Sequence, residues 1–81
     1  MPTDPKRLFG LRLIELRKAK GWSQERLALE SGLARSYLGG VERGHRNIAL
    51  LNIVKLAETL EVAAPALLEL PAEAVGPDNI K

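Results

Sequence analysis

The chain has 81 residues, enough for one small domain with a thin hydrophobic core. It contains no cysteine, which excludes a disulfide framework and any Cys-ligated zinc or redox site, and we expect neither a metal nor a cofactor. The net charge of +2 is unevenly distributed: residues 6–47 hold ten Lys or Arg against four acidic residues, whereas residues 48–81 hold two against five. This distribution suggests a basic face suited to a polyanion, and on charge alone it fits an ordinary solvated surface equally well.

Several classes of protein are disfavoured by what the sequence lacks. No apolar run approaches the roughly 20 residues that span a membrane. The first 13 residues mix charged with apolar side chains, so they contain no h-region of a signal peptide. The sequence also shows no Ser/His/Asp pattern, no phosphate-cradling glycine loop and no metal-ligand cluster, and we therefore expect no enzymatic activity.

The spacing of apolar residues predicts an all-α fold of five short helices. They are expected at residues 6–20, 24–31, 34–43, 50–60 and 65–70. Residues 6–70 would form the domain, between a flexible lead-in at residues 1–5 and a tail at residues 71–81. The tail contains two prolines and a glycine and has no periodic apolar pattern.

Capping residues and glycines set the expected boundaries of these helices. Ser23 is placed to cap the second helix, and Gly32 ends it. The fourth helix has no good N-cap, because Ala49 stands where Ser, Thr or Pro would be usual. Its core-facing stripe is expected to comprise Leu50, Ile53, Ala57 and Leu60, with Leu56 beside it.

The second and third helices, joined by a tight turn at Gly32-Leu33, form the pattern of a DNA-binding helix-turn-helix. The corner would be packed by four apolar residues: Ala28, Leu33, Leu38 and Val41. A recognition helix reads bases mainly with residues near its N-terminus, and those residues here are Arg35, Ser36 and Tyr37. Arginine can bind guanine O6 and N7 with two hydrogen bonds. Tyr37 could instead belong partly to the core.

Two stretches, WSQERLALESGLARSYLGGVERGHRN and LLNIVKLAETLEV, resemble the phage repressor/Cro-like (XRE) helix-turn-helix family. The resemblance covers about residues 8–70 and implies a compact, lambda-repressor-like domain. Within that family the chain is most similar to the controller proteins of restriction–modification systems. These are dimeric regulators that bind operators upstream of their own gene and of the endonuclease gene. A protein of this kind is expected in the cytoplasm, associated with the nucleoid.

The resemblance also assigns roles to individual positions. It implies base reading at Arg35, Ser36 and Tyr37, where the adjacent Gly39 and Gly40 contribute no side chain to read DNA. Contacts to the DNA backbone are expected from residues at the start of the second helix and after the third: Ser23, Gln24, Arg43, Arg46 and Asn47. Arg17 and Glu42 occupy positions where family members often form a structural ion pair.

Apolar residues outside the expected core indicate a homodimer. Ile48, Leu51, Val54 and Leu70 could form an exposed patch, which on a small domain often marks a partner surface. Two recognition helices would then read a palindromic operator in double-stranded DNA, with half-sites about one turn apart. Two alternatives stay open. One is an antitoxin-type regulator whose tail folds on a toxin protein. The other is a protein-interaction module without DNA specificity.

Overall fold

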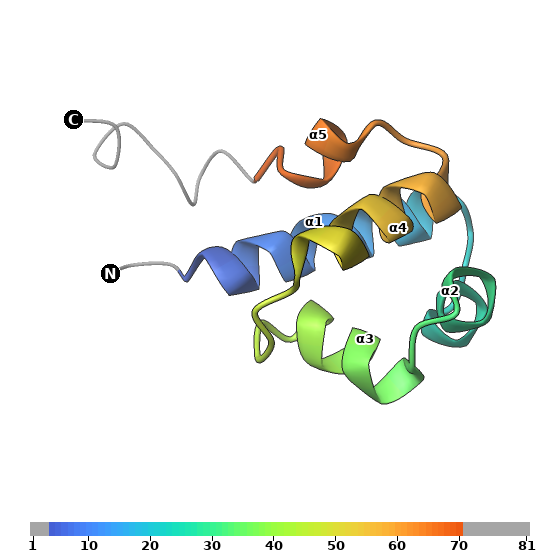
Figure 1. The fold of residues 1–81 in the computed structure, drawn as a ribbon, viewed down its shortest axis with the longest axis horizontal. Helices are drawn as coiled ribbons and strands as arrows, with labels where there is room; N and C mark the ends of the chain where they lie inside the picture. Colours follow the sequence, from blue (N-terminus) through green and yellow to red (C-terminus); the bar gives the residue numbers. More distant parts are fainter. Residues whose placement is uncertain (1–3, 71–81) are drawn as a thin grey trace.

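The computed structural model of the protein describes residues 4–70, which fold into five helices and contain no strand (Figure 1). The helices are α1 (Pro5–Ala19), α2 (Gln24–Ser31), α3 (Arg35–Glu42), α4 (Leu50–Leu60) and α5 (Ala64–Leu67). The predicted all-α fold of five helices is therefore confirmed. The expected tail at residues 71–81 and most of the expected lead-in, residues 1–3, lie outside the described residues.

The first helix begins one residue earlier than expected, at Pro5, and ends one residue earlier, at Ala19. Asp4 is its N-cap and accepts a hydrogen bond from the backbone N–H of Lys6 at 2.9 Å. Pro5 suits the first helical position because its missing N–H would have no partner there. The Lys6 N–H and then the Lys6 ammonium lower the pKa of Asp4. This cap is therefore fully effective above the carboxyl's ordinary pKa and is lost as pH falls through the lower folded-state value.

The turn between α2 and α3 is fixed by local hydrogen bonds and one glycine. The Ser23 hydroxyl accepts from the N–H of Arg26 at 3.0 Å, as expected of an N-cap. Gly32 has φ 77°, a left-handed conformation that costs other residues free energy. The buried Ser31 hydroxyl accepts from the N–H of Leu33 at 3.2 Å. α3 is one residue shorter at each end than predicted, because Ala34 is extended and Arg43 is the C-cap.

Each helix contributes one leucine that is fully buried in a single core. These residues are Leu13, Leu27, Leu38, Leu56 and Leu67, and Val41 of α3 joins them. Burying one such side chain contributes roughly 1.5–3 kcal/mol. Because all five helices share this one cluster, the orientation of α3 depends on helices that are distant in sequence.

α4 has the predicted bounds, but its core stripe differs from the prediction at one end. Leu56, Ala57 and Leu60 are buried, whereas Leu50 is 72% exposed. Helical side chains point back toward the N-terminus and cover the turn before their own Cα. Leu50 is the first residue of α4, so its side chain extends past the end of the helix instead of onto the core.

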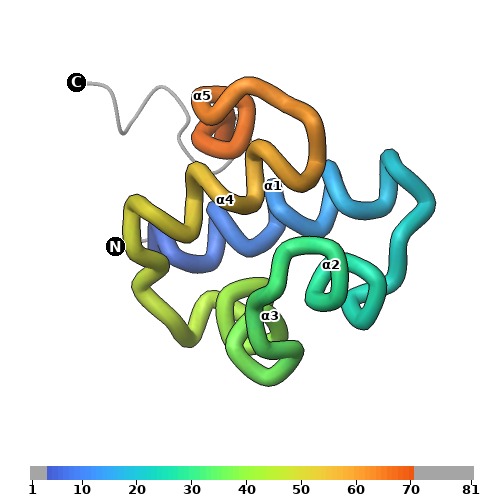
Figure 2. The backbone as a smooth tube through the Cα atoms, turned by 45° about the vertical axis from the view of Figure 1, so that its right-hand side comes forward, coloured from blue at the N-terminus to red at the C-terminus, as the bar shows by residue number. Residues whose placement is uncertain are grey.

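The fifth helix is predicted at residues 65–70, but it begins one residue earlier, at Ala64, and ends at Leu67. Pro71 disfavours a helical conformation at Leu70. Leu68 has already left the helix, with φ −102° and ψ 9°, and its N–H donates to the carbonyl of Pro65 at 2.9 Å in a tight turn. Arg12 Nε donates to the carbonyl of Ala66 at 2.7 Å and thereby ties α5 to α1. α5 and α3 lie on opposite sides of the layer formed by α1 and α4 (Figures 1 and 2).

Across the part of the chain that the structure describes, no helix combines the length and apolar character that crossing a bilayer requires.

Candidate nucleic-acid interface

The first turn of α3 presents two of the predicted base-reading residues to solvent. Arg35 and Ser36 are both exposed. The Arg35 guanidinium lies 3.7 Å from a carboxylate oxygen of Glu25 in the first turn of α2. An exposed pair at this distance is weak and screened by salt, so Arg35 can leave Glu25 for a stronger hydrogen-bond acceptor.

Tyr37 belongs to both the core and the surface. Its side chain is half-buried and packs against the core cluster. Its hydroxyl accepts a hydrogen bond from Asn52 Nδ2 of α4 at 3.1 Å. The guanidinium carbon of Arg46 lies 5.5 Å from the centre of its ring. Tyr37 therefore packs partly against the core, and the rest of its side chain is accessible at the surface where DNA contact is predicted.

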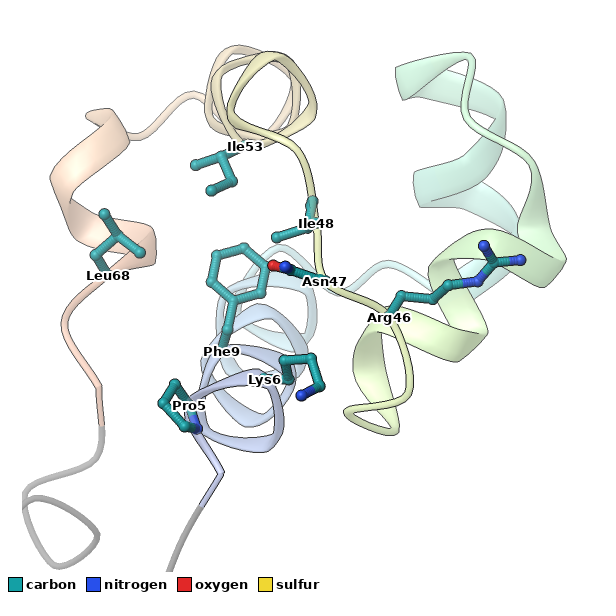
Figure 3. A pocket seen from close by; sticks show the side chains of 8 residues that line it. All are labelled: Pro5, Lys6, Phe9, Arg46, Asn47, Ile48, Ile53 and Leu68. Carbon is teal, nitrogen blue, oxygen red and sulfur yellow. The ribbon is translucent and has the colours of Figure 1, made fainter.

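The residues that follow α3 supply the positive charge of this surface. Arg43, Arg46 and Asn47 are all exposed. Within residues 4–70, neither arginine forms an ion pair. Figure 3 shows Arg46 extending from the loop across α3. Charged groups without a carboxylate partner are suited to binding phosphate oxygens, which is the role expected of them.

A buried ion pair connects this surface to α1. Arg17 Nε and Nη2 donate to the two carboxylate oxygens of Glu42 at 2.7 and 3.0 Å. Arg17 Nη1 also donates to the carbonyl of Trp22 at 2.9 Å. The Glu42 side chain is only 3% exposed. The structure thus contains the ion pair that the family resemblance implied.

Gln24 has a role that the sequence did not reveal. Its Nε2 donates to Glu42 Oε1 at 2.7 Å, so the same carboxylate holds the start of α2 and the end of α3. The amide nitrogen carries a second proton that this bond does not use. The predicted phosphate contact of Gln24 is therefore compatible with its contact to Glu42. Ser23 is exposed next to it.

Gly10 of α1 is a second feature that sequence reasoning missed. A Cβ at Gly10 would lie 2.5 Å from the carbonyl oxygen of Glu42 and 2.6 Å from that of Val41. The absence of a side chain there allows α1 to contact the backbone at the end of α3. Nothing in the local periodicity distinguishes Gly10 from other helical residues, because the contact joins distant segments.

The expected dimer residues do not all lie on the surface. Leu51 is 82% and Val54 is 38% exposed, and the neighbouring Leu50 is exposed as well. Ile48 and Leu70, in contrast, are partly buried against the core, because the loop before α4 and the segment after α5 fold back onto it. The exposed apolar surface of α4 therefore consists of Leu50, Leu51 and Val54, and we call these three residues the α4 patch.

A pocket opens between α1, the loop before α4, α4 and α5 (Figure 3). Its floor is apolar, with Phe9, Ile48, Ile53 and Leu68 around it, while Lys6 and Arg46 lie to one side. Together, the side chains that line this pocket do not make up a set of catalytic groups. Residues 4–70 likewise contain no cluster of His, Cys, Asp or Glu of the size that holds a metal ion.

Comparison with known proteins gives consistent matches. Residues 13–67 match the helix-turn-helix family model. A hypothetical transcription factor of Neisseria meningitidis is 51% identical over 65 residues, which are 80% of this chain and 59% of that longer protein. The restriction-modification controller protein C.AhdI from Aeromonas hydrophila is similar in structure, with 60% identity, a TM-score of 0.75 and coverage of 76% of this chain and 94% of C.AhdI. SinR, a master regulator for biofilm formation solved in complex with DNA, is also similar in structure, with 35% identity and a TM-score of 0.72. The match covers 75% of this chain and 98% of the SinR chain.

Proposed function

The chain belongs to the helix-turn-helix family of DNA-binding transcription regulators, and we propose that it binds palindromic operators as a homodimer and regulates its own gene. Its similarity to C.AhdI supports the narrower proposal that it is a controller protein of a restriction–modification system. Such a regulator acts in the cytoplasm on the nucleoid and catalyses no reaction. The observation that carries the proposal is the exposed first turn of α3 beside Arg43 and Arg46, two arginines without ion-pair partners in residues 4–70.

The first experiment compares DNA from upstream of the protein's own gene with random DNA of equal length, over a series of salt concentrations. A sequence-specific regulator binds its operator roughly 10³-fold or more tightly than random DNA. Saturation at two chains per palindrome would establish the dimeric complex. Equal, weak and steeply salt-dependent binding to both DNAs would overturn the proposal and favour a protein-interaction module.

Two arginine variants separate base reading from backbone binding. Arg35→Ala should cost about 1–3 kcal/mol on the operator and relax discrimination at one base position, since it removes a direct contact to a base. Arg46→Ala should weaken binding to all sequences more evenly and reduce the slope of affinity against salt, since it removes a phosphate contact. Binding titrations on operator, single-base variants and random DNA measure both effects. The assignment is wrong if the two variants show the same pattern.

The α4 patch supports the proposed homodimer, because three large apolar side chains stand together on one exposed helix surface. Its place on α4 leaves α3 free for DNA. Paired recognition helices about 34 Å apart would match half-sites one turn apart.

Leu51→Glu should convert the dimer to a monomer, because a carboxylate in an apolar interface loses its hydration without gaining a partner. Sedimentation equilibrium measures the change. Leu29→Glu is the matched control, since Leu29 is 77% exposed on α2 and is not part of the α4 patch, and this variant should remain a dimer. A dimeric Leu51→Glu variant would show that the chains associate through another surface.

A further inference from the structure

Two adjacent glycines in α3 leave room that arginine side chains occupy. A Cβ at Gly40 would lie 2.9 Å from Cγ of Arg46, whereas one at Gly39 would lie 3.1 Å from Nη1 of Arg43. Cγ is close to the backbone of Arg46, so a methyl group at Gly40 would displace the whole side chain. Nη1 is the free end of Arg43 and can move aside easily. The two glycines therefore differ in what they permit.

The position of Arg46 against Gly40 determines where its charge lies. Figure 3 shows the side chain running across α3, away from the apolar pocket. Its guanidinium carbon reaches a point 5.5 Å from the ring centre of Tyr37, within the range of a cation–π interaction. Tyr37 precedes Gly40 by three residues, so both lie on one face of α3.

Tyr37 also has contacts with α4 and with the core, besides its contact with Arg46. Asn52 of α4 donates to its hydroxyl at 3.1 Å, and the ring packs partly against the core. Arg46 and Tyr37 thus come from different segments but lie against one another in the free protein.

We propose that Gly40 is a positioning residue for DNA recognition, because its missing side chain seats Arg46 on α3 so that Arg46 and Tyr37 meet DNA as one preformed unit. This inference rests on the proposed function, in which Tyr37 reads bases and Arg46 binds phosphate. A preformed pair avoids the entropy lost when a long side chain is ordered on binding. It also fixes the phosphate contact in register with the base contact. Gly40, whose missing side chain in the sequence only reduces the number of residues that can read DNA, then has a role of its own.

The position of the Arg46 side chain against Gly40 can be tested without DNA, by nuclear Overhauser effects measured in the free protein. We expect contacts from the Arg46 γ protons to Gly40 and from the Arg46 side chain to the Tyr37 ring. The Arg46–Tyr37 contacts should disappear in Gly40→Ala and persist in the control Gly39→Ala. Alanine favours helix more than glycine, so the melting temperature of Gly40→Ala should not fall through loss of helix. If Gly40→Ala does lose its fold, adding Arg46→Ala should restore it. Persistence of the Arg46–Tyr37 contacts in folded Gly40→Ala, or absence of the contacts from the wild type, would overturn the proposal.

The role in recognition is tested by a double-mutant cycle on the operator. Gly40→Ala should weaken binding about three- to tenfold, the ordering cost of one long side chain. In the Arg46→Ala background the same change should have no further effect. A further loss in that background would mean that the added methyl group clashes with DNA directly, and Gly40 would not act through Arg46. If the wild type does not prefer its operator, the proposed function fails, although the contacts in the free protein would still be observed.

Discussion

Replacing Gly10 with alanine is expected to destabilise the protein by about 3 kcal/mol, at the upper end for overpacked sites. The added Cβ would lie 2.5 and 2.6 Å from the carbonyl oxygens of Glu42 and Val41. Both atoms are backbone at the end of α3, so no side-chain rotation relieves the clash. The helices must separate, which opens the core that Leu13 and Leu38 share. A loss of this size is a large share of the roughly 5–15 kcal/mol that stabilises a typical domain.

The free energy of unfolding, from denaturant titrations monitored by Trp22 fluorescence, measures this effect. Gly39→Ala is the matched control in a neighbouring helix, since its new methyl group comes closest to the free end of Arg43 and meets no backbone atom of another segment within 4 Å among its three nearest neighbours. Oε1 of Gln24 would lie 3.7 Å from this methyl group, an ordinary van der Waals distance. The Gly39→Ala variant should be as stable as the wild type or gain up to about 0.5–1 kcal/mol, because alanine restricts the unfolded chain more than glycine does. Equal stabilities of Gly10→Ala and Gly39→Ala would show that α1 and α3 need not approach so closely.

Replacing Glu42 with alanine is expected to cost about 3–5 kcal/mol, the range for breaking a buried ion pair by removing one partner. Arg17, whose side chain is 11% exposed, would keep its charge but lose two of its hydrogen bonds. Gln24 would lose its only side-chain acceptor among the described residues. The start of α2 and the end of α3 would then no longer be tied together, so operator binding should weaken along with stability.

The exposed pair Arg26–Glu30 provides the control, because its oxygen–nitrogen distance of 2.8 Å is nearly the same but both side chains are solvated. Glu30→Ala should cost no more than about 0.5 kcal/mol. The double variant Arg17→Met with Glu42→Met should lose less than the sum of its two single variants, because no uncompensated charge stays buried. If the loss in free energy of unfolding of the double variant equalled the sum of the two single losses, the two residues would stabilise the fold independently.

The sequence by itself determined the helix-turn-helix and the bounds of two helices. α2 and α4 have the predicted residues because apolar spacing marks their lengths, and at α2 Ser23 and Gly32 mark both ends. These signals act within about four residues, so a local pattern contains all the information they need. A local pattern also predicts that Arg35 and Ser36 lie in the first turn of α3.

Tertiary structure decided which apolar residues face solvent. Ile48 and Leu70 pack partly against the core although they were expected in the dimer patch, and Leu50 is exposed although it was expected in the core. An apolar residue near a helix end or in a loop has no periodic neighbours that assign it a face. Its burial depends on which other segment covers it.

Only the tertiary structure could reveal three of the contacts that hold α3 in place. The Asn52–Tyr37 bond spans 15 positions, the Gln24–Glu42 bond spans 18, and Gly10 meets carbonyl oxygens more than 30 residues away. Such pairs leave no mark in a single sequence, because each residue is individually ordinary for its helix. These contacts form only when five short helices, each too short to be stable alone, pack around one core.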